Sequence, residues 1–241
     1  MRASNLSSQN QKYSLVVTGC IHAVTEAELS ARSFALKTPA PSTTKTSHQA
    51  GCISVDFEGG DASGWTNDPM STCLTGGFVV GIPNEVVDSG TMTQVHGDHT
   101  TGTGNAFFSG INTSAGTHDV DSGVCIISSP TYSVSEESSV SIWYFHGQRD
   151  AGDDPTGDFF SLKMSINGGI TWSVLAENGD KTSNAAWLEA TDTVQAGSKV
   201  QFMVEISDGT GPGDLIEAGI DDLLICPIYQ SKSSQKNNEE N

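Results

Sequence analysis

Two segments of the chain alternate strictly between apolar and polar side chains. The apolar positions are Phe160, Leu162, Met164 and Ile166 in the first segment and Val200, Phe202, Val204 and Ile206 in the second. A period of two places every second side chain on one face of a β-strand. Both segments are therefore predicted to be strands that have one face in a hydrophobic core.

Similar short runs fill the sequence between residues 51 and 228. Asn167-Gly168-Gly169 is a strong turn signal between two of them, and the 26 glycines favour many turns over long helices. The predicted strands are 53–57, 77–81, 106–108, 124–127, 140–146, 159–166, 172–176, 186–193, 200–207 and 219–225. This pattern predicts an all-β domain, an antiparallel β-sandwich, at residues 51–228.

The two ends of the chain have other patterns. Residues 12–17 alternate like a strand, so residues 1–19 are predicted to hold the terminal strand of a preceding domain or an unpaired tail. Thr25 and Glu28 form a capping-box pattern, which predicts a short helix before a linker rich in Pro, Ser and Thr, together at residues 20–50. Residues 229–241 are mostly polar and charged and are predicted to be disordered.

The charge balance argues against some classes of partner. With 11 Lys and Arg residues against 29 Asp and Glu residues, the formal net charge is −18. Such a chain repels phosphate backbones and anionic lipids, so neither nucleic acid nor a membrane surface is an expected partner. No apolar run reaches the roughly 18–20 residues that a membrane span needs, and no membrane insertion is expected. No secretory signal is visible, so the chain is expected to be cytosolic or to have its export signal further upstream.

Five acidic residues mark the beginning, the middle and the end of the predicted domain. They are Asp56, Glu58, Asp98, Asp221 and Asp222. If the first and last strands are neighbours, these carboxylates come close together, and carboxylate and carbonyl oxygens suit Ca²⁺. The five are therefore candidate ligands of a structural Ca²⁺ ion, and a solvated acidic rim is the alternative.

Two glycine-rich segments carry a second acidic group. Its members are Asp150, Asp153, Asp154, Asp158, Asp208 and Asp214. Both segments lie at the ends of predicted strands and could meet at one end of the sandwich. They predict a second Ca²⁺ site or a ligand-binding rim, with a mobile acidic loop as an equal alternative.

Tryptophans are the candidates for ligand stacking. Exposed aromatic rings stack on sugars, but a tryptophan in a sandwich is more often in the core. Trp143 lies within an apolar run and is predicted to be in the core. Trp172 and Trp187 lie near predicted turns and are the candidates for contact with a ligand.

The sequence lacks the motifs of common catalytic sites. It contains no G-x-S-x-G elbow, no recognisable Ser/His/Asp set and no phosphate-binding glycine loop. His96 and His99 lack the further ligands of a metallohydrolase and are predicted to belong to a turn. Carboxylates are plentiful enough for a glycosidase pair, but no pair stands out. We therefore predict that the chain is not an enzyme.

Several short motifs stand in a fixed order between residues 52 and 223. They are Cys52, Asp56-Phe57-Glu58, Gly64-Trp65, Asp98-His99-Thr100-Thr101-Gly102, Ser129-Pro130, residues 140–146, Val200-Gln201-Phe202 and residues 218–223. Their order and spacing resemble those of a MAM domain, a jelly-roll sandwich of many extracellular proteins. The resemblance implies a jelly roll at about residues 52–227, of the kind attached to secreted bacterial peptidases, subtilisin-like ones among them, and to glycan-degrading enzymes. It also favours the metal over the acidic rim. Because no cysteine stands just before Gly64, the disulfide pattern of eukaryotic members is not transferred.

The chain has five cysteines, at positions 20, 52, 73, 125 and 226. None has zinc-site spacing, and an extracellular acidic domain is expected to pair them, with buried free thiols as the alternative. In a jelly roll whose terminal strands are neighbours, Cys52 and Cys226 can approach bonding distance. Cys73 and Cys125 each flank an apolar strand and form the expected second pair, which leaves Cys20 free.

These features predict a non-catalytic, calcium-stabilised binding or adhesion module of a secreted bacterial protein, accessory to a peptidase. The expected ligand is a protein or a glycan, and the chain is expected to be a monomer. The alternative hypothesis is a carbohydrate-binding module of a polysaccharide-degrading enzyme, and a third hypothesis is a jelly-roll lyase or glycosidase.

Overall fold

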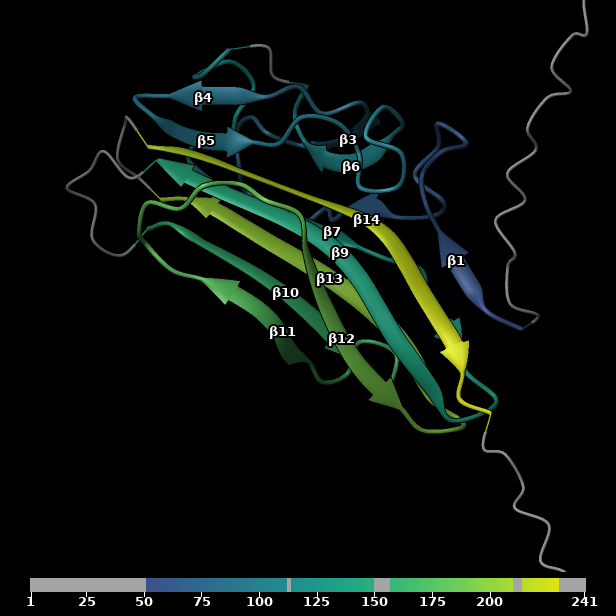
Figure 1. Ribbon diagram of the computed structural model, residues 1–241. Coiled ribbons are helices and arrows are strands. Elements are labelled where there is room, and N and C mark those ends of the chain that lie inside the picture. The colour runs from purple at the N-terminus through teal and green to yellow at the C-terminus, as the bar shows by residue number, and fades with distance from the viewer. Residues whose placement is uncertain (1–50, 112–113, 150–156, 210–213, 230–241) are drawn as a thin grey trace, which may run out of the picture. The chain divides into compact units, whose positions relative to one another are not determined.

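The computed structural model describes residues 51–111, 114–149, 157–209 and 214–229, which form β-strands and loops (Figure 1). Within these ranges no helix is long and apolar enough to cross a bilayer. The predicted terminal strand at 1–19, the helix and linker at 20–50, and all of the predicted tail except Tyr229 lie outside the described residues.

Six strands form sheet A, in the order β12-β9-β14-β6-β3, with β1 paired to the other side of part of β14. Their bounds are β1 (Ile53–Val55), β3 (Phe78–Gly81), β6 (Ala106–Ser109), β9 (Ser138–Arg149), β12 (Leu188–Val194) and β14 (Leu215–Pro227). All pairings in the sheet are antiparallel.

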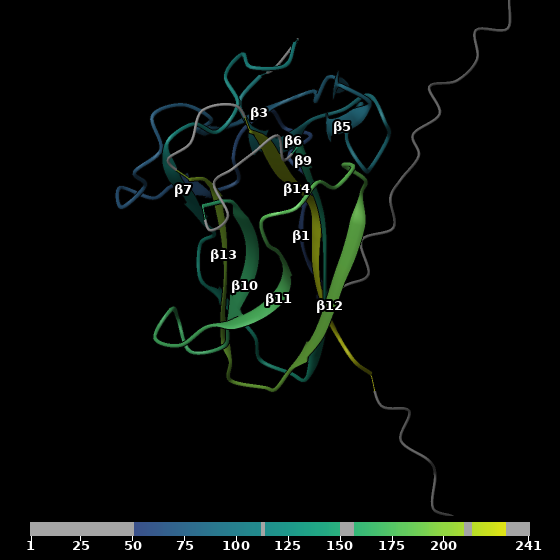
Figure 2. The same ribbon diagram turned by 90° about the vertical axis from the view of Figure 1, so that its left-hand side faces the viewer.

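Six further strands form sheet B, in the order β11-β10-β13-β7-β2, with β8 paired to β13. Their bounds are β2 (Thr66–Asn67), β7 (Gly123–Ser128), β8 (Tyr132–Ser133), β10 (Phe159–Ser165), β11 (Ser173–Asn178) and β13 (Lys199–Asp208). Figure 2 shows the two layers, with β10 and β13 in one and β12 and β14 in the other. The described chain is thus an all-β sandwich of two antiparallel sheets, as the sequence predicts.

The main hydrophobic core lies between the two sheets. Ile142 and Ile220 of sheet A and Leu162 and Val204 of sheet B are at most 1 % exposed and belong to one cluster. The predicted alternation accounts for this packing, because its apolar positions within β10 and β13 all point into the core. Ile166 is the exception: β10 ends at Ser165, and Ile166 is exposed in the turn that follows.

The first and last strands of the sandwich are neighbours. Ile53 lies opposite Ile225 in the β1–β14 pair, and Cys52 is bonded to Cys226 just beyond them, with Cα atoms 4.3 Å apart. A second disulfide joins Cys73 and Cys125, with Cα atoms 5.1 Å apart. These are the two pairs expected from the sequence, and Cys20 lies outside the described residues.

The strand predicted at 53–57 ends earlier, at Val55. Phe57 has a positive φ of 53°, which lies outside the extended region that a regular strand requires. Its side chain is still buried in the core, at 1 % exposure. Asp56 and Glu58 therefore lie on a turn rather than on one face of a strand.

A hairpin of β4 (Val86–Asp88) and β5 (Thr91–Gln94) belongs to neither sheet and packs beside β9, near the top of Figure 1. A second hydrophobic cluster lies there, centred on Val95, Phe108 and Phe145. Sheet A is thus covered on both of its faces at this end of the sandwich.

Candidate functional site

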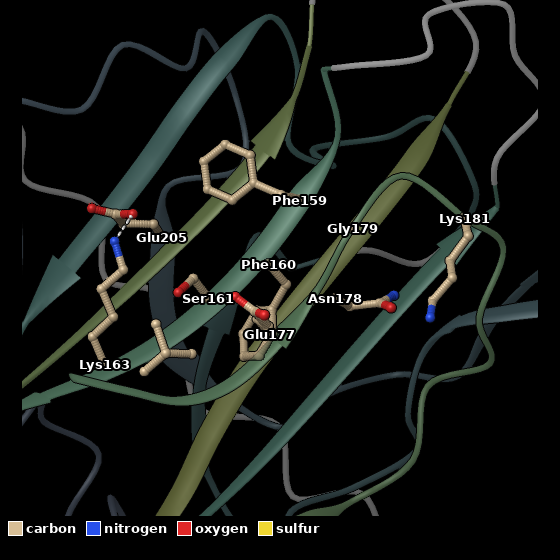
Figure 3. A pocket seen from close by; sticks show the side chains of 10 residues that line it. Phe159, Phe160, Ser161, Lys163, Glu177, Asn178, Gly179, Lys181 and Glu205 are labelled. Atoms are coloured by element: carbon tan, nitrogen blue, oxygen red, sulfur yellow. Dashed lines mark hydrogen bonds and ion pairs between the residues drawn. The ribbon is translucent and has the colours of Figure 1, made fainter.

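The outer face of sheet B carries a cleft of about 630 Å³ over β10, β11 and β13. Because Phe160 and Leu162 point into the core, the alternate residues of β10, at positions 159, 161 and 163, point outward. The side chains that the cleft presents include Phe159, Ser161, Lys163, Glu177, Asn178, Lys181 and Glu205 (Figure 3).

Strand pairing places a short side chain between two carboxylates on the floor of the cleft. Ser161 of β10 lies opposite Glu177 of β11 on one side and opposite Glu205 of β13 on the other. The hydroxyl of Ser161 is enclosed and has no hydrogen-bond partner. The floor is therefore hollowed at Ser161 and polar on both sides of it.

The rest of the lining combines one ring with charges of both signs. Lys163 Nζ lies 2.5 Å from Glu205 Oε2, an ion pair that is partly shielded from water. Figure 3 shows this pair on one side of the cleft, Lys181 on the opposite side, and the ring of Phe159 between them. Such a lining offers hydrogen-bond donors, acceptors and an apolar ring to one ligand.

Three aspartates meet where β10 and β14 begin and β13 ends. One carboxylate oxygen from each of Asp158, Asp208 and Asp214 lies within 4.8 Å of the others, and all three side chains are buried. We call them the aspartate cluster. Its geometry could hold a metal ion. The other members of the predicted second group, Asp150, Asp153 and Asp154, lie outside the described residues.

Within the aspartate cluster, the surroundings of Asp208 disfavour the ionised form of its carboxyl. Burial, together with the negative charges of Asp158, Asp121 and Asp214, raises the pKa of Asp208 to about 7. The backbone N–H of Ser122, 3.3 Å from Asp208 Oδ2, opposes this shift. A bound cation would favour the ionised carboxylates.

Asp98 organises the loop between β5 and β6. Its carboxylate accepts hydrogen bonds from the backbone N–H groups of Thr101 at 2.8 Å and Gly104 at 2.7 Å. Burial by itself would raise the pKa of Asp98, but these hydrogen bonds outweigh it, and the pKa is lowered. The carboxyl of Glu58 lies within hydrogen-bonding reach of Asp98, and burial and this neighbour raise the pKa of Glu58.

Asp221 and Asp222 hold the same loop from β14. Asp221 Oδ2 accepts the backbone N–H of His99 at 2.9 Å, and Asp222 Oδ2 lies 2.7 Å from His99 Nδ1. Asp221 is fully buried, and this burial, together with the charge of Asp222, raises its pKa to about 7.

The first predicted group is therefore divided between two kinds of contact. Glu58 faces Asp98, whereas Asp221 and Asp222 bind the loop through His99, and Asp56 accepts the N–H of Glu58 at 3.2 Å. Within the described residues, no three of these carboxylates meet the distance requirement that the aspartate cluster meets. A Ca²⁺ ion at the first group stays a prediction.

Trp143 is not placed as predicted. Trp143 is half-buried and lies outside the core, because its neighbour Ile142 takes the inward position. Instead its ring stacks on His99, with centroids 3.6 Å apart. The prediction that Trp143 is a core residue is wrong.

The two tryptophans proposed for ligand stacking are both half-buried. Trp187 packs edge-on against Phe145, and its Nε1 donates a hydrogen bond to the carbonyl of Gly97 at 3.3 Å. These contacts belong to the second hydrophobic cluster. Trp172 lies beside Gly169, in the turn between β10 and β11. Neither residue lines the cleft.

Sequence reasoning missed the cleft residues. Ser161, Glu177 and Glu205 are ordinary polar residues in three strands, and only the pairing of the strands brings them together. The available signal was the polar half of the alternation in β10 and β13, whose apolar half identified the core.

Neither a family model nor a curated protein sequence matches this chain. Among solved structures, the K1 cleaved adhesin domain of Lys-gingipain from Porphyromonas gingivalis W83 is similar, with a TM-score of 0.46, 14% identity, and coverage of 74% of this chain and 99% of that one. The CBM22-1 xylan-binding domain of Paenibacillus barcinonensis Xyn10C has a TM-score of 0.41, 12% identity, and coverage of 74% and 95%.

Proposed function

We propose that the domain is a non-catalytic binding module that holds a glycan in the cleft of sheet B. The observation that carries this proposal is the row formed by Glu177, Ser161 and Glu205 across the floor, beside the ring of Phe159. Carboxylates accept hydrogen bonds from sugar hydroxyls, and an aromatic ring packs against the apolar face of a sugar.

The charge of the cleft narrows the class of glycan. Lys163 is already paired with Glu205, so its positive charge is partly neutralised. The chain as a whole has a formal net charge of −18. A neutral glycan fits these charges better than an acidic one. The net negative charge of the protein would repel an acidic glycan, and the paired Lys163 would attract it only weakly.

A protein ligand is the second candidate. Ile166, Ile170 and Val174 belong to the β10–β11 hairpin and are 53%, 80% and 50% exposed. Val174 also lines the cleft. Exposed aliphatic side chains beside a polar cleft favour adhesion to a protein surface.

The setting that we propose is extracellular. Two disulfides are typical of oxidising compartments. In this proposal the domain is MAM-like and monomeric. It is an accessory part of a secreted bacterial protein such as a subtilisin-like peptidase. Ca²⁺ stabilises its fold. The carboxylate-rich aspartate cluster supports Ca²⁺, because hard cations take oxygen ligands.

A glycan array with the full chain tests the ligand class, followed by calorimetric titration of the glycans that bind. Glu177→Gln and Phe159→Ala should each weaken binding at least tenfold, the loss of about 1.4 kcal/mol that one hydrogen bond or ring contact supplies. Glu85→Gln changes an exposed glutamate outside the cleft and should leave binding unchanged.

Two outcomes would contradict the proposal. Binding that is unaffected by both cleft variants would place the ligand elsewhere on the sandwich. Release of product from a bound polysaccharide would mean that the domain is a lyase or glycosidase, and the cleft carboxylates would then be tested as its catalytic pair.

A further inference from the structure

The aspartate cluster lies at the end of the strands that form the cleft. Asp158 directly precedes β10, and Asp208 is the last residue of β13. Phe159 and Ser207 are paired in this antiparallel ladder, so the two aspartates lie opposite each other at its end. Asp214 directly precedes β14, and one of its carboxylate oxygens lies within 4.8 Å of those of the other two aspartates.

Two enclosed oxygen atoms at the cluster have no hydrogen-bond donor. One is Oδ1 of Asp208, a side chain that is 4% exposed. The other is Oε1 of Gln148, a residue of β9 that is fully buried. The amide of Gln148 faces the cluster, since its Nε2 donates a hydrogen bond to Asp158 Oδ2 at 3.0 Å. Buried polar atoms in proteins nearly always have a partner, which is a protein group, an ordered water or a bound ion.

We propose that Asp158, Asp208 and Asp214 bind one divalent cation of the Ca²⁺ type, and that this ion fixes the end of the cleft. All the ligand atoms that these side chains offer are oxygens, which hard cations prefer. Ca²⁺ binds oxygen at about 2.3–2.6 Å, so two ligands on opposite sides of the ion are about 4.8 Å apart. The spacing within the aspartate cluster, at most 4.8 Å, lets one ion reach all three carboxylates.

Gln148 supplies a neutral oxygen to the same ion. The two ends of a side-chain amide have nearly the same shape, so a half-turn of the amide exchanges Nε2 for Oε1 at little steric cost. After that exchange Oε1 points toward Asp158 and meets the cation instead of lacking a partner. Ca²⁺ accepts such carbonyl oxygens readily, whereas Mg²⁺ keeps most of its water and demands octahedral geometry.

The ion acts on the cleft through the backbone. Phe159, whose ring lines the cleft, directly follows Asp158, and its strand partner Ser207 directly precedes Asp208. A cation that ties Asp158 to Asp208 holds this pair of residues at the end of the sheet. The carboxylates repel one another when no ion is bound, and this end of the cleft loosens. This last step rests on the proposed function; the cation site itself does not.

Calorimetric titration of the full chain with CaCl₂ at pH 7.5, after removal of metal with EDTA and desalting, tests the site. Asp208→Asn keeps the shape of the side chain and removes one charged ligand, so it should abolish one equivalent of Ca²⁺ binding or weaken it at least tenfold. Asp192→Asn changes an exposed aspartate of β12 and should bind as the wild type does. MgCl₂ should bind at least tenfold more weakly than CaCl₂.

Nuclear magnetic resonance locates the ion without a variant. Ca²⁺ should shift the backbone amide signals of Phe159, Ser207 and Leu215 and slow their hydrogen exchange. Asp221→Asn, in the first acidic group, should leave these shifts in place. Unchanged Ca²⁺ binding by Asp208→Asn, or shifts confined to the surroundings of Asp98 and Asp221, would overturn the inference. A protein that binds Ca²⁺ at the aspartate cluster but binds no glycan or protein contradicts the proposed function alone.

Discussion

Cys52 and Cys226 are bonded across 174 residues of sequence, and their disulfide joins the first and last strands of the sandwich. Ile53 and Ile225, beside them, form the first pair of the β1–β14 ladder. The bond therefore fixes the register of β1, a strand of only three residues. The second disulfide, between Cys73 and Cys125, spans 52 residues.

Loss of the longer disulfide should destabilise the fold more than loss of the shorter one. In the chain-entropy model a bridge limits the unfolded chain, and it contributes about 5 kcal/mol for the longer loop and about 4 kcal/mol for the shorter. The Cys52→Ala/Cys226→Ala variant should therefore lose more free energy of unfolding than Cys73→Ala/Cys125→Ala. Urea denaturation without reductant measures both. The reverse order would mean that β1 is held mainly by its contacts.

The contribution of His146 to stability should fall as the pH falls below about 6.5. Burial, followed by the charge of Lys181, lowers the pKa of His146 to about 4. Its Nδ1 accepts hydrogen bonds from Asn178 Nδ2 and Ser183 Oγ, both at 3.2 Å, which requires the neutral ring. Between pH 6.5 and 4 the unfolded chain binds a proton that the folded chain does not, so this contribution is complete above pH 6.5 and is lost toward pH 4.

The expected loss from His146 is about 2 to 3 kcal/mol between pH 7.5 and pH 4.5. Carboxylates titrate in the same range, so the measurement compares the wild type with His146→Gln, which keeps an acceptor and removes the titrating ring. The difference between their free energies of unfolding should change with pH by this amount. A difference that stays constant would mean that His146 titrates normally in the folded protein.

The close approach of the β4–β5 hairpin to sheet A requires a glycine at position 147. A Cβ atom there would overlap the backbone of Thr93 in β5, and a backbone has no rotamer to change. Gly147→Ala should therefore cost about 1 to 3 kcal/mol or more in free energy of unfolding, measured by urea denaturation. Gly179→Ala is the matched control, because an added Cβ meets nothing within 4 Å there. Equal stability of the two variants would mean that the hairpin moves freely.

The sequence was most informative where one face of a strand is buried and the other is exposed. In β13 the apolar positions Val200, Phe202, Val204 and Ile206 are all buried, as the alternation predicts. In β9 the same reasoning failed, because the hairpin covers the second face of the strand. Apolar side chains then follow one another, and Trp143 and Phe145 point away from the main core.

Sites assembled from several strands were harder to predict than the strands themselves. Asp158, Asp208 and Asp214 were among the candidates because each stands at a strand end in a glycine-rich segment. Which of the acidic residues would meet depends on the pairing of β10 with β13, and no local pattern encodes that pairing. The hairpin of β4 and β5 was missed for a similar reason, since residues 91–94 carry no apolar alternation.

Glu58→Gln should change the thermal stability in opposite directions with and without Ca²⁺. The carboxyl of Glu58 faces that of Asp98, and this neighbour raises its pKa after burial does. Without a cation, the substitution removes one of two adjacent negative charges, and the new side-chain amide can donate a hydrogen bond to Asp98. With Ca²⁺ bound at the first acidic group, the same change removes a ligand, and the variant gains less stability from the ion.

Differential scanning calorimetry at pH 7.5 in EDTA and in millimolar CaCl₂ measures both directions. In EDTA the melting temperature of Glu58→Gln should exceed that of the wild type, and in CaCl₂ it should be lower. Glu85→Gln, an exposed glutamate before β4, should follow the wild type in both buffers. If Glu58→Gln gains as much from CaCl₂ as the wild type does, Glu58 is not a ligand. The contact between Glu58 and Asp98 would then be a repulsion that the hydrogen bonds from Thr101 and Gly104 to Asp98 outweigh.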